Sequence, residues 1–288
     1  MRKEENLLAF VKNSFVPLSP AQIPITDRGF RYGDGVFETI RVSQGIAYQL
    51  EQHLKRLYYG LDALCIPHPS INIKEICYQL ITINHLETGF LRLTITRGTS
   101  GFGYLPSSTS NPLVVAQCGH HMNKNSENFQ PFKIWLSSIR RPDSRSIPNK
   151  IKTLQGLPSI LARIEAEEND CDEALLLGPN GELCEGSSTN IFWVKNGILY
   201  TPSLELPIVA GTIRDTIIRI NKSNVRTGVF TLDDLISAQE VMLTNTNWLV
   251  RGVSQLLPGN QFKWNPGFYT NKLFNMVKQD IISYVETK

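Results

Sequence analysis

The sequence predicts a two-domain α/β protein. Its length of 288 residues is sufficient for two domains with separate cores. In both halves, segments with the alternating pattern of strands are interspersed with segments of helical period. Between the halves the composition becomes polar and loses its period, which predicts a linker at 121–131. We therefore expect a small N-terminal α/β domain at 1–120 and a larger C-terminal α/β domain at 132–288.

Composition and charge exclude several classes of function. The chain is 41% hydrophobic and 19% charged, and its net charge of +3 is too small to suggest a nucleic-acid partner. The apolar stretch at 7–11 is too short for a signal peptide or a membrane span, so we expect a cytoplasmic protein without a membrane partner. The five cysteines and five histidines lack metal-ligand spacing, so we expect no metal.

In the N-terminal half, two patterns predict regular elements. Leu91, Leu93 and Ile95 alternate with polar residues and predict a strand at 90–97. Leucines recur at helical spacing from Leu50 to Leu64 and predict an amphipathic helix at 50–65. The other predicted elements are strands at 7–11, 14–16, 36–42, 46–48 and 113–118 and a helix at 73–86. Glycine-rich loops are predicted at 27–35 and 98–106.

In the C-terminal half, Asn196-Gly197 between two apolar runs predicts a β-hairpin. A helix is predicted from near Pro158, and its periodicity places four residues towards the core. These residues are Ile160, Leu161, Ile164 and Ala166. The remaining predicted elements are strands at 132–137, 173–177, 190–194, 198–200 and 240–246 and helices at 212–221, 231–234 and 269–285.

Three features downstream of residue 150 together suit pyridoxal phosphate chemistry. Lys152 offers an amine for the cofactor aldehyde, and Glu185 offers a carboxylate for the ring nitrogen. The stretch 211–214 begins a predicted helix, whose N–H groups suit a phosphate. Taken singly, a lysine is more often a solvated surface residue, as we expect for Lys150, and a glutamate in a turn is often only exposed.

The order of these features resembles the class IV aminotransferase family, the fold type IV enzymes that use pyridoxal 5'-phosphate. The similarity extends from about residue 27 to about residue 250. The segments that carry it are 32–39 (YGDGVFET), 53–57 (HLKRL), 96–98 (TRG), 151–153 (IKT), 172–175 (DEAL), 185–192 (EGSSTNIF) and 211–214 (GTIR). The resemblance implies a two-domain enzyme whose larger C-terminal domain is barrel-like.

The resemblance also implies roles for individual residues. Lys152 is expected to be the catalytic, cofactor-linked lysine, and Glu185 the carboxylate that keeps the ring nitrogen protonated. Arg56 is expected to grip the phosphate, together with the backbone N–H groups of Thr212 and Ile213. The other expected cofactor contacts are Ser187, Ser188 and Thr246. The expected substrate contacts are Tyr32, Glu38, Arg97, Tyr104 and Asn245. Which of Thr244, Asn245 and Thr246 faces the phosphate stays open.

Within the family, the segments 27–39 and 97–104 resemble 4-amino-4-deoxychorismate lyases more than branched-chain aminotransferases. They imply a lyase that forms 4-aminobenzoate and pyruvate, in folate biosynthesis. The alternative is an aminotransferase of the branched-chain or D-amino acid type, which uses the same residues on a small-molecule amine. A third possibility is a binding module that keeps the fold without the cofactor. The resemblance further implies a homodimer.

Overall fold

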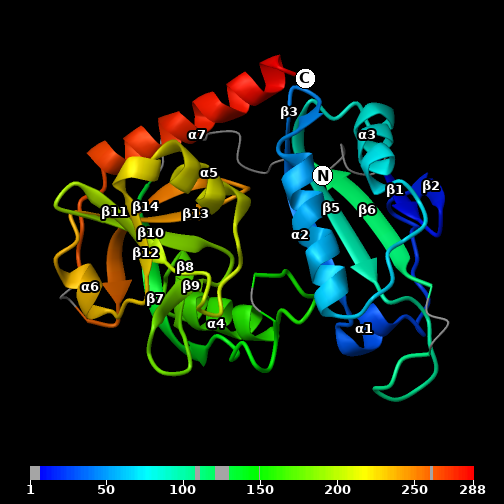
Figure 1. The fold of residues 1–288 in the computed structure, drawn as a ribbon, viewed down its shortest axis with the longest axis horizontal. Coiled ribbons are helices and arrows are strands. Elements are labelled where there is room, and N and C mark those ends of the chain that lie inside the picture. Colours follow the sequence, from blue (N-terminus) through cyan, green and yellow to red (C-terminus); the bar gives the residue numbers. More distant parts are fainter. Residues whose placement is uncertain (1–6, 108–110, 121–129, 149, 260–261) are drawn as a thin grey trace. The chain divides into compact units, whose positions relative to one another are not determined.

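The computed structural model describes residues 7–107, 111–120, 130–148, 150–259 and 262–288 (Figure 1). The chain divides into two compact units. Unit 1 comprises Met1–Lys124, Ile151–Gln155 and Ile281–Lys288, and unit 2 comprises Asn125–Lys150 and Gly156–Asp280. The boundaries therefore differ from the predicted ones, because two later segments belong to unit 1. Residues 121–129 of the predicted linker lie outside the described residues.

Unit 1 is a six-stranded sheet in the order β2-β1-β6-β5-β3-β4, with two helices packed on one face (Figure 1). Its elements are β1 (Leu8–Val11), β2 (Ser14–Pro17), α1 (Arg28–Tyr32), β3 (Gly35–Ser43), β4 (Ile46–Ala47), α2 (Leu50–Ala63), α3 (Ile73–Ile83), β5 (Thr88–Thr96) and β6 (Leu113–Gly119). Strand β3 buries Val36, Ile40 and Val42 in the core that it forms with the helices. Strand alternation places Phe37 and Thr39 on its opposite face.

The segment 151–155 extends this sheet along β3. Thr153 forms an antiparallel bridge with Val36. The Phe37 N–H donates to the Lys152 carbonyl at 2.9 Å, and the Leu154 N–H donates to the Gly35 carbonyl at 3.0 Å. These two backbone bonds fix Lys152 directly opposite Phe37.

Unit 2 is an eight-stranded sheet that closes on itself. The strand order is β12-β11-β10-β13-β14-β7-β8-β9, and β9 also pairs with β10. Its strands are β7 (Phe132–Arg140), β8 (Glu173–Leu177), β9 (Leu183–Gly186), β10 (Asn190–Lys195), β11 (Ile198–Pro202), β12 (Val225–Gly228), β13 (Glu240–Asn245) and β14 (Leu249–Leu257). Its helices are α4 (Leu157–Glu168), α5 (Thr212–Ile220), a 3₁₀ turn at Lys222–Asn224, α6 (Asp233–Ile236) and α7 (Phe268–Glu286), whose last residues belong to unit 1. The predicted barrel-like α/β fold is confirmed.

The predicted strands and helices all occur, with shifted ends, but the 27–35 loop was predicted wrongly. It contains α1, which Asp27 caps by accepting from the N–H groups of Gly29 and Phe30 at 2.8 and 3.3 Å. Gly33 ends α1 with a φ of 66°. The three glycines of this segment lower its helix propensity, so its sequence does not indicate a helix. Strands β9, β12 and β14 were also not predicted.

Of the four residues of α4 that were predicted to face the core, only Ala166 is buried. Ala162 and Ala166 are fully buried and pack with residues of β7 and β8. The larger apolar residues lie outside, with exposed fractions of 57% for Ile160, 42% for Leu161 and 48% for Ile164. Because alanines let a helix approach a sheet closely, the small residues define the packed face here.

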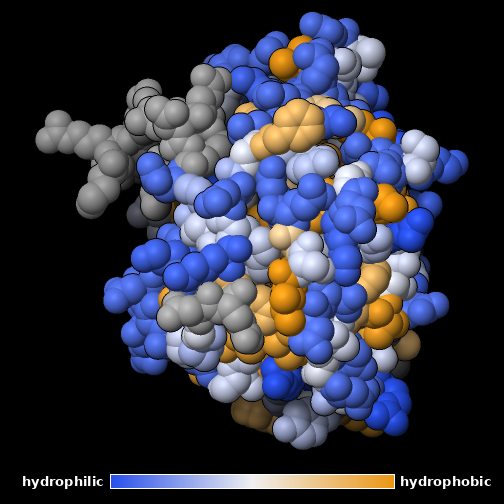
Figure 2. All heavy atoms as spheres, turned by 90° about the vertical axis from the view of Figure 1, so that its left-hand side faces the viewer, coloured by the Kyte–Doolittle hydropathy of each residue, from blue (hydrophilic) through white to orange (hydrophobic). Residues whose placement is uncertain are grey.

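The surface drawn in Figure 2 is mostly hydrophilic, with small hydrophobic patches among the charged side chains. Within the described ranges, no helix has the length and hydropathy that a membrane span requires.

Candidate active site

In unit 2, Glu185 is a buried carboxylate that three donors hold. Its Oε2 accepts from the Val209 N–H at 2.9 Å and from Asn190 Nδ2 at 3.1 Å. Its Oε1 lies 3.2 Å from Nη2 of Arg141. The two hydrogen bonds and the ion pair with Arg141 all favour the carboxylate anion. Arg141 was not predicted as a site residue, since its turn-rich segment carries no motif.

Asn190 brings the predicted site residues of unit 2 together. It stands opposite Glu185 in the β9–β10 pairing and opposite Thr244 in the β10–β13 pairing. Its Nδ2 also donates to the Val209 carbonyl at 3.0 Å. A Cβ at Gly211 would collide with its Oδ1. Asn190 thus links the carboxylate, the strand end and the start of α5.

The start of α5 has the properties of an anion site. Gly211 is its N-cap, and no side chain caps the first turn. Among the described residues, the buried hydroxyls of Thr212 and Thr244 have no hydrogen-bond partner. A helix of this length with an uncapped N-terminus attracts anions through its N–H groups and its dipole. Two buried hydroxyls without partners fit the oxygens of a phosphate group.

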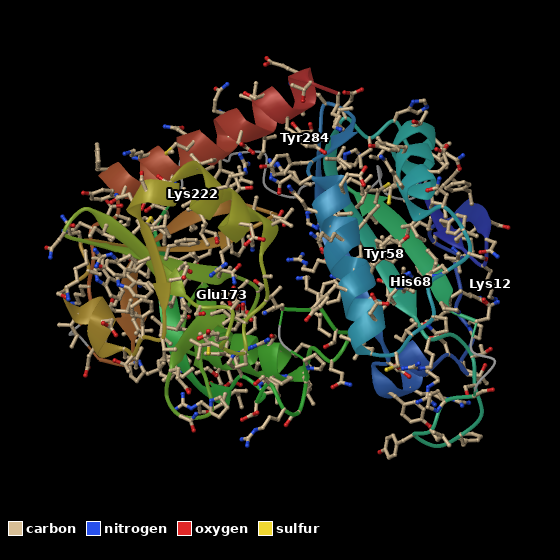
Figure 3. All side chains as sticks on the ribbon, in the orientation of Figure 1. Lys12, Tyr58, His68, Glu173, Lys222 and Tyr284 are labelled. Carbon is tan, nitrogen blue, oxygen red and sulfur yellow. The ribbon has the colours of Figure 1, made fainter. Side chains whose placement is uncertain are left out.

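Ser187 and Ser188 are anchored by Glu173, which belongs to the segment 172–175 but was given no site role in the sequence analysis. Both hydroxyls donate to Glu173, Ser188 at 2.8 Å and Ser187 in a shorter contact. Glu173, labelled in Figure 3, is the first residue of β8. The Ala174 N–H donates to the same carboxylate at 2.9 Å. Glu173 therefore fixes the turn between Glu185 and Asn190, and the two serines contribute to this turn.

The end of β13 separates the three candidates for the phosphate contact. Asn245 accepts from the N–H groups of Asn247 and Trp248 at 2.9 and 3.0 Å, so its oxygen shapes the turn. Thr244 is buried opposite Asn190. Thr246 is half-buried just beyond the strand. Thr244 thus has the better position to meet an anion at α5.

In unit 1, Lys152 and Arg92 share one aromatic ring. Nζ of Lys152 lies 4.5 Å from the centre of the Phe37 ring, and Cζ of Arg92 lies 3.5 Å from it. Arg92 also donates to the Thr39 hydroxyl at 3.3 Å. Burial lowers the pKa of Arg92, and the charge of Glu38 partly offsets this. Arg92 was missed because it appeared only as a polar residue of an alternating strand.

Glu38, His53 and Arg56 form a buried cluster between β3 and α2. Glu38 accepts from Nε and Nη2 of Arg56 at 2.6 and 2.5 Å. Its Oε2 also lies 2.7 Å from Nδ1 of His53. Burial alone would raise the pKa of Glu38, but the charges and hydrogen bonds of Arg56 and His53 outweigh it and lower this pKa to about 2. The predicted phosphate arginine and the predicted substrate glutamate are therefore partners.

Arg97 has a structural environment. Its guanidinium donates to Asp34 at 2.7 and 3.1 Å and to the carbonyls of Leu64 and Cys65 at 2.7 Å each. Burial alone would raise the pKa of Asp34, but the hydrogen bonds and charges of Arg97 and Arg28 outweigh burial and lower this pKa below its ordinary value. These contacts account for the burial of Arg97, so its predicted substrate contact has no support within unit 1.

Tyr32 and Tyr104 lie together at the edge of unit 1. Their ring centres are 5.7 Å apart, and the Tyr32 hydroxyl accepts from the Gly103 N–H at 3.2 Å. Arg28 donates to the Tyr104 carbonyl at 2.9 Å and so holds the loop in place. Tyr104 itself is 87% exposed. Unit 1 thus brings together the two predicted tyrosines, and their substrate contact stays a prediction.

Comparison with known proteins gives a consistent pattern. A family profile described as "Amino-transferase class IV" matches residues 35–256. A putative branched-chain-amino-acid aminotransferase of Methanocaldococcus jannaschii is 33% identical over 242 residues, with 82% of this chain and 83% of the relative covered. A D-alanine aminotransferase of Listeria monocytogenes is 31% identical over 244 residues, with the same coverage.

A lyase and a solved structure complete the comparison. An aminodeoxychorismate lyase of Bacillus subtilis is 29% identical over 246 residues, with 83% of each chain covered. The solved structure is a branched-chain amino acid aminotransferase of T.th. with pyridoxamine 5'-phosphate. It is 25% identical with a TM-score of 0.86, and the match covers 97% of this chain and 95% of that one.

Proposed function

The chain belongs to the class IV aminotransferase family, and from that premise we propose that it transfers amino groups between an amino acid and a 2-keto acid. It is an enzyme, and its cofactor is pyridoxal 5'-phosphate. When bound, the cofactor supplies an aldehyde that links to amines and a ring that withdraws electrons from the amine-bearing carbon. The substrates are small amino and keto acids.

The residues of unit 2 serve the two ends of the cofactor in this proposal. Glu185 holds a proton on the ring nitrogen, because Arg141 and Asn190 fix it as an anion. Backbone N–H groups of Thr212 and Ile213 bind the phosphate, with the Thr244 hydroxyl beside them and Thr246 as the alternative. Ser187 and Ser188 support the ring through the turn that Glu173 anchors.

Two residues of unit 1, Lys152 and Arg56, complete the proposed cofactor site. The amine of Lys152 would hold the cofactor aldehyde, and the same Nζ would act as the base for the proton on the amine-bearing carbon of the substrate. Arg56 binds the phosphate with its guanidinium.

The observation that favours amino-group transfer is the placement of Arg92 beside Lys152 on the Phe37 ring. No carboxylate of the described chain forms an ion pair with Arg92, and burial leaves its charge poorly solvated. A substrate carboxylate relieves this cost. In an amino acid the carboxylate is bonded to the amine-bearing carbon, so a lysine and an arginine on one ring suit that pair of groups. The higher identity to two aminotransferases supports the same choice.

Aminodeoxychorismate lyase is the second candidate. The segments 27–39 and 97–104 and the 29% identity to a lyase support it. The two activities need the same cofactor residues and differ in the substrate. In the lyase substrate neither carboxylate is bonded to the amine-bearing carbon, unlike in an amino acid, so the assays below separate the two candidates.

Parallel assays test the proposal. The purified holoenzyme is given amino donors with 2-oxoglutarate or pyruvate, and separately 4-amino-4-deoxychorismate. We expect keto acid and new amino acid from the first assay and no 4-aminobenzoate from the second. Lys152→Ala is expected to abolish transfer and the visible absorbance that borohydride bleaches, whereas Lys150→Gln retains both. Efficient formation of 4-aminobenzoate with no amino-group transfer would assign the lyase instead, and a colourless wild-type protein would leave only a binding module.

A further inference from the structure

Both oxygens of the Glu38 carboxylate are engaged within unit 1. Arg56 takes Oε1 through Nε and Oε2 through Nη2, and His53 approaches Oε2 as well. The side chain of Glu38 is only 1% exposed. A carboxylate so enclosed has little surface left for a substrate. Its predicted place on the substrate wall therefore does not explain its contacts.

We propose that Glu38 is a positioning residue, which holds the guanidinium of Arg56 in one orientation for the cofactor phosphate. This inference rests on the proposed function, in which Arg56 binds that phosphate. The two-point contact fixes the plane of the guanidinium as well as its position. With Nε and Nη2 both bound to Glu38, the Nη1 edge of Arg56 faces away from this carboxylate.

His53 strengthens this arrangement from the same helix. It lies one helical turn before Arg56, so both side chains project from one face of α2 towards β3. Burial lowers the pKa of His53, with Glu38 opposing the shift and the charges of Arg56 and Lys152 adding to it. Because a carboxylate accepts hydrogen bonds, Nδ1 of His53 is the donor in its contact with Glu38. Within the described residues, its buried Nε2 has no hydrogen-bond partner.

Loss of the Glu38 charge has two opposite effects on phosphate binding, so the direction of the change in cofactor affinity tests the proposal. A carboxylate next to Arg56 also neutralises its charge, and could therefore weaken the attraction of the arginine for a phosphate. If positioning dominates, removal of the Glu38 charge weakens phosphate binding. If neutralisation dominates, the same change strengthens it. The two effects therefore predict opposite shifts in cofactor affinity.

The test compares the affinity of the apoenzyme for pyridoxal 5'-phosphate with its affinity for pyridoxal, which lacks the phosphate. Binding is followed by cofactor absorbance and tryptophan fluorescence. For Glu38→Gln we expect the affinity for the phosphorylated cofactor to fall roughly tenfold and that for pyridoxal to change less than about twofold. The control, Glu51→Gln, removes an exposed carboxylate of α2 that pairs with Lys74, and should change neither affinity.

Arg56→Lys distinguishes a failure of the proposed role of Arg56 from a failure of the proposed role of Glu38. If Arg56→Lys leaves the preference for the phosphorylated cofactor intact, the proposed role of Arg56 is wrong. If Arg56→Lys lowers this preference but Glu38→Gln leaves it unchanged or raises it, the positioning role of Glu38 is overturned. Should Glu38→Gln not fold, Glu38→Asp replaces it. That shorter side chain keeps the charge but loses the two-point contact, so the same selective loss is expected, and an unchanged preference contradicts the proposal.

Discussion

Gly211 allows the start of α5 to lie against Asn190. A Cβ there would overlap Oδ1 of Asn190, whose amide nitrogen holds both Glu185 and the Val209 carbonyl. Gly211→Ala must therefore displace either the helix start or the asparagine. We expect an overpacking cost of about 1–3 kcal/mol, which appears as weaker cofactor binding and a lower unfolding temperature of the apoenzyme.

A second glycine provides the control. Gly156 precedes α4 in the same unit, has a negative φ, and has no heavy atom within 4 Å of the position that an added methyl group would take. Gly156→Ala is therefore expected to leave both measurements unchanged. If Gly211→Ala binds pyridoxal 5'-phosphate as tightly as the wild-type protein, Asn190 does not restrict the helix start.

The residues that sequence patterns identified differ from those they missed in the range of their contacts. Lys152, Glu185 and Arg56 stand in short segments with a characteristic order, which a sequence reveals directly. Arg141 acts on Glu185 from a segment distant in sequence, and Glu173 reaches the serine turn across the β8–β9 pairing. Such partners depend on strand register and on tertiary contacts, neither of which a local pattern specifies.

At the scale of elements, the start of α7 depends on a side chain from another strand. Glu240, the first residue of β13, accepts from the N–H groups of Gly267, Tyr269 and Thr270 at 2.9 Å each and from the Thr270 hydroxyl at 2.7 Å. These donors include first-turn N–H groups that lack partners inside the helix. Glu240→Gln is expected to lower the free energy of unfolding of the chain by about 1–3 kcal/mol at neutral pH, as measured by denaturant titration.

The difference in the free energy of unfolding between wild type and Glu240→Gln should depend on pH, because of the same contacts. Burial raises the pKa of Glu240, but its donors outweigh this and lower it below its ordinary value of 4.5. A lowered pKa contributes stability that is present above the unfolded-state pKa and is lost as the pH falls through the folded-state value. The gap between wild type and Glu240→Gln should therefore narrow only below about pH 4.5. Glu286→Gln, an exposed change near the other end of α7, serves as control, and a gap that widens in acid contradicts this account.

Helices α1 and α4 show what limits prediction at this scale. The period of a sequence identifies a helix, but its buried face is set by what it packs against. In α4 the closest packing comes from Ala162 and Ala166, so the larger apolar residues that the pattern assigned to the core lie outside. In α1 an aspartate cap and a glycine at positive φ define five residues that lack any period.

At the scale of the molecule, the division into two units could be predicted only in outline. The composition change near residue 121 indicated two domains, and the strand and helix patterns gave their contents. That residues 151–155 and 281–288 belong to unit 1 depends on pairing with β3 and on packing of the last turns of α7, as between Tyr284 and Tyr48. Neither contact leaves a local signal in the sequence.

The expected homodimer can be tested through the outer face of α4. Leu157, Ile160, Leu161 and Ile164 form an apolar stripe at helical spacing, with Leu157 exposed by 62% and Ile160 by 57%. Apolar stripes of this kind mark interaction surfaces. If this face is a subunit contact, Ile160→Lys with Ile164→Lys should weaken association by about 3 kcal/mol or more, since two charges would be buried without partners.

Sedimentation or light scattering at several concentrations measures the effect. The wild-type protein is expected to have the mass of two chains, and the double variant to dissociate towards one as it is diluted. Val229→Lys is the matched control, because Val229 is 59% exposed in unit 2 but lies outside the stripe. A monomeric wild-type protein would remove the homodimer expectation altogether. A double variant that stays dimeric at the same concentrations as Val229→Lys would place the subunit contact elsewhere and leave the α4 stripe as solvent-facing surface.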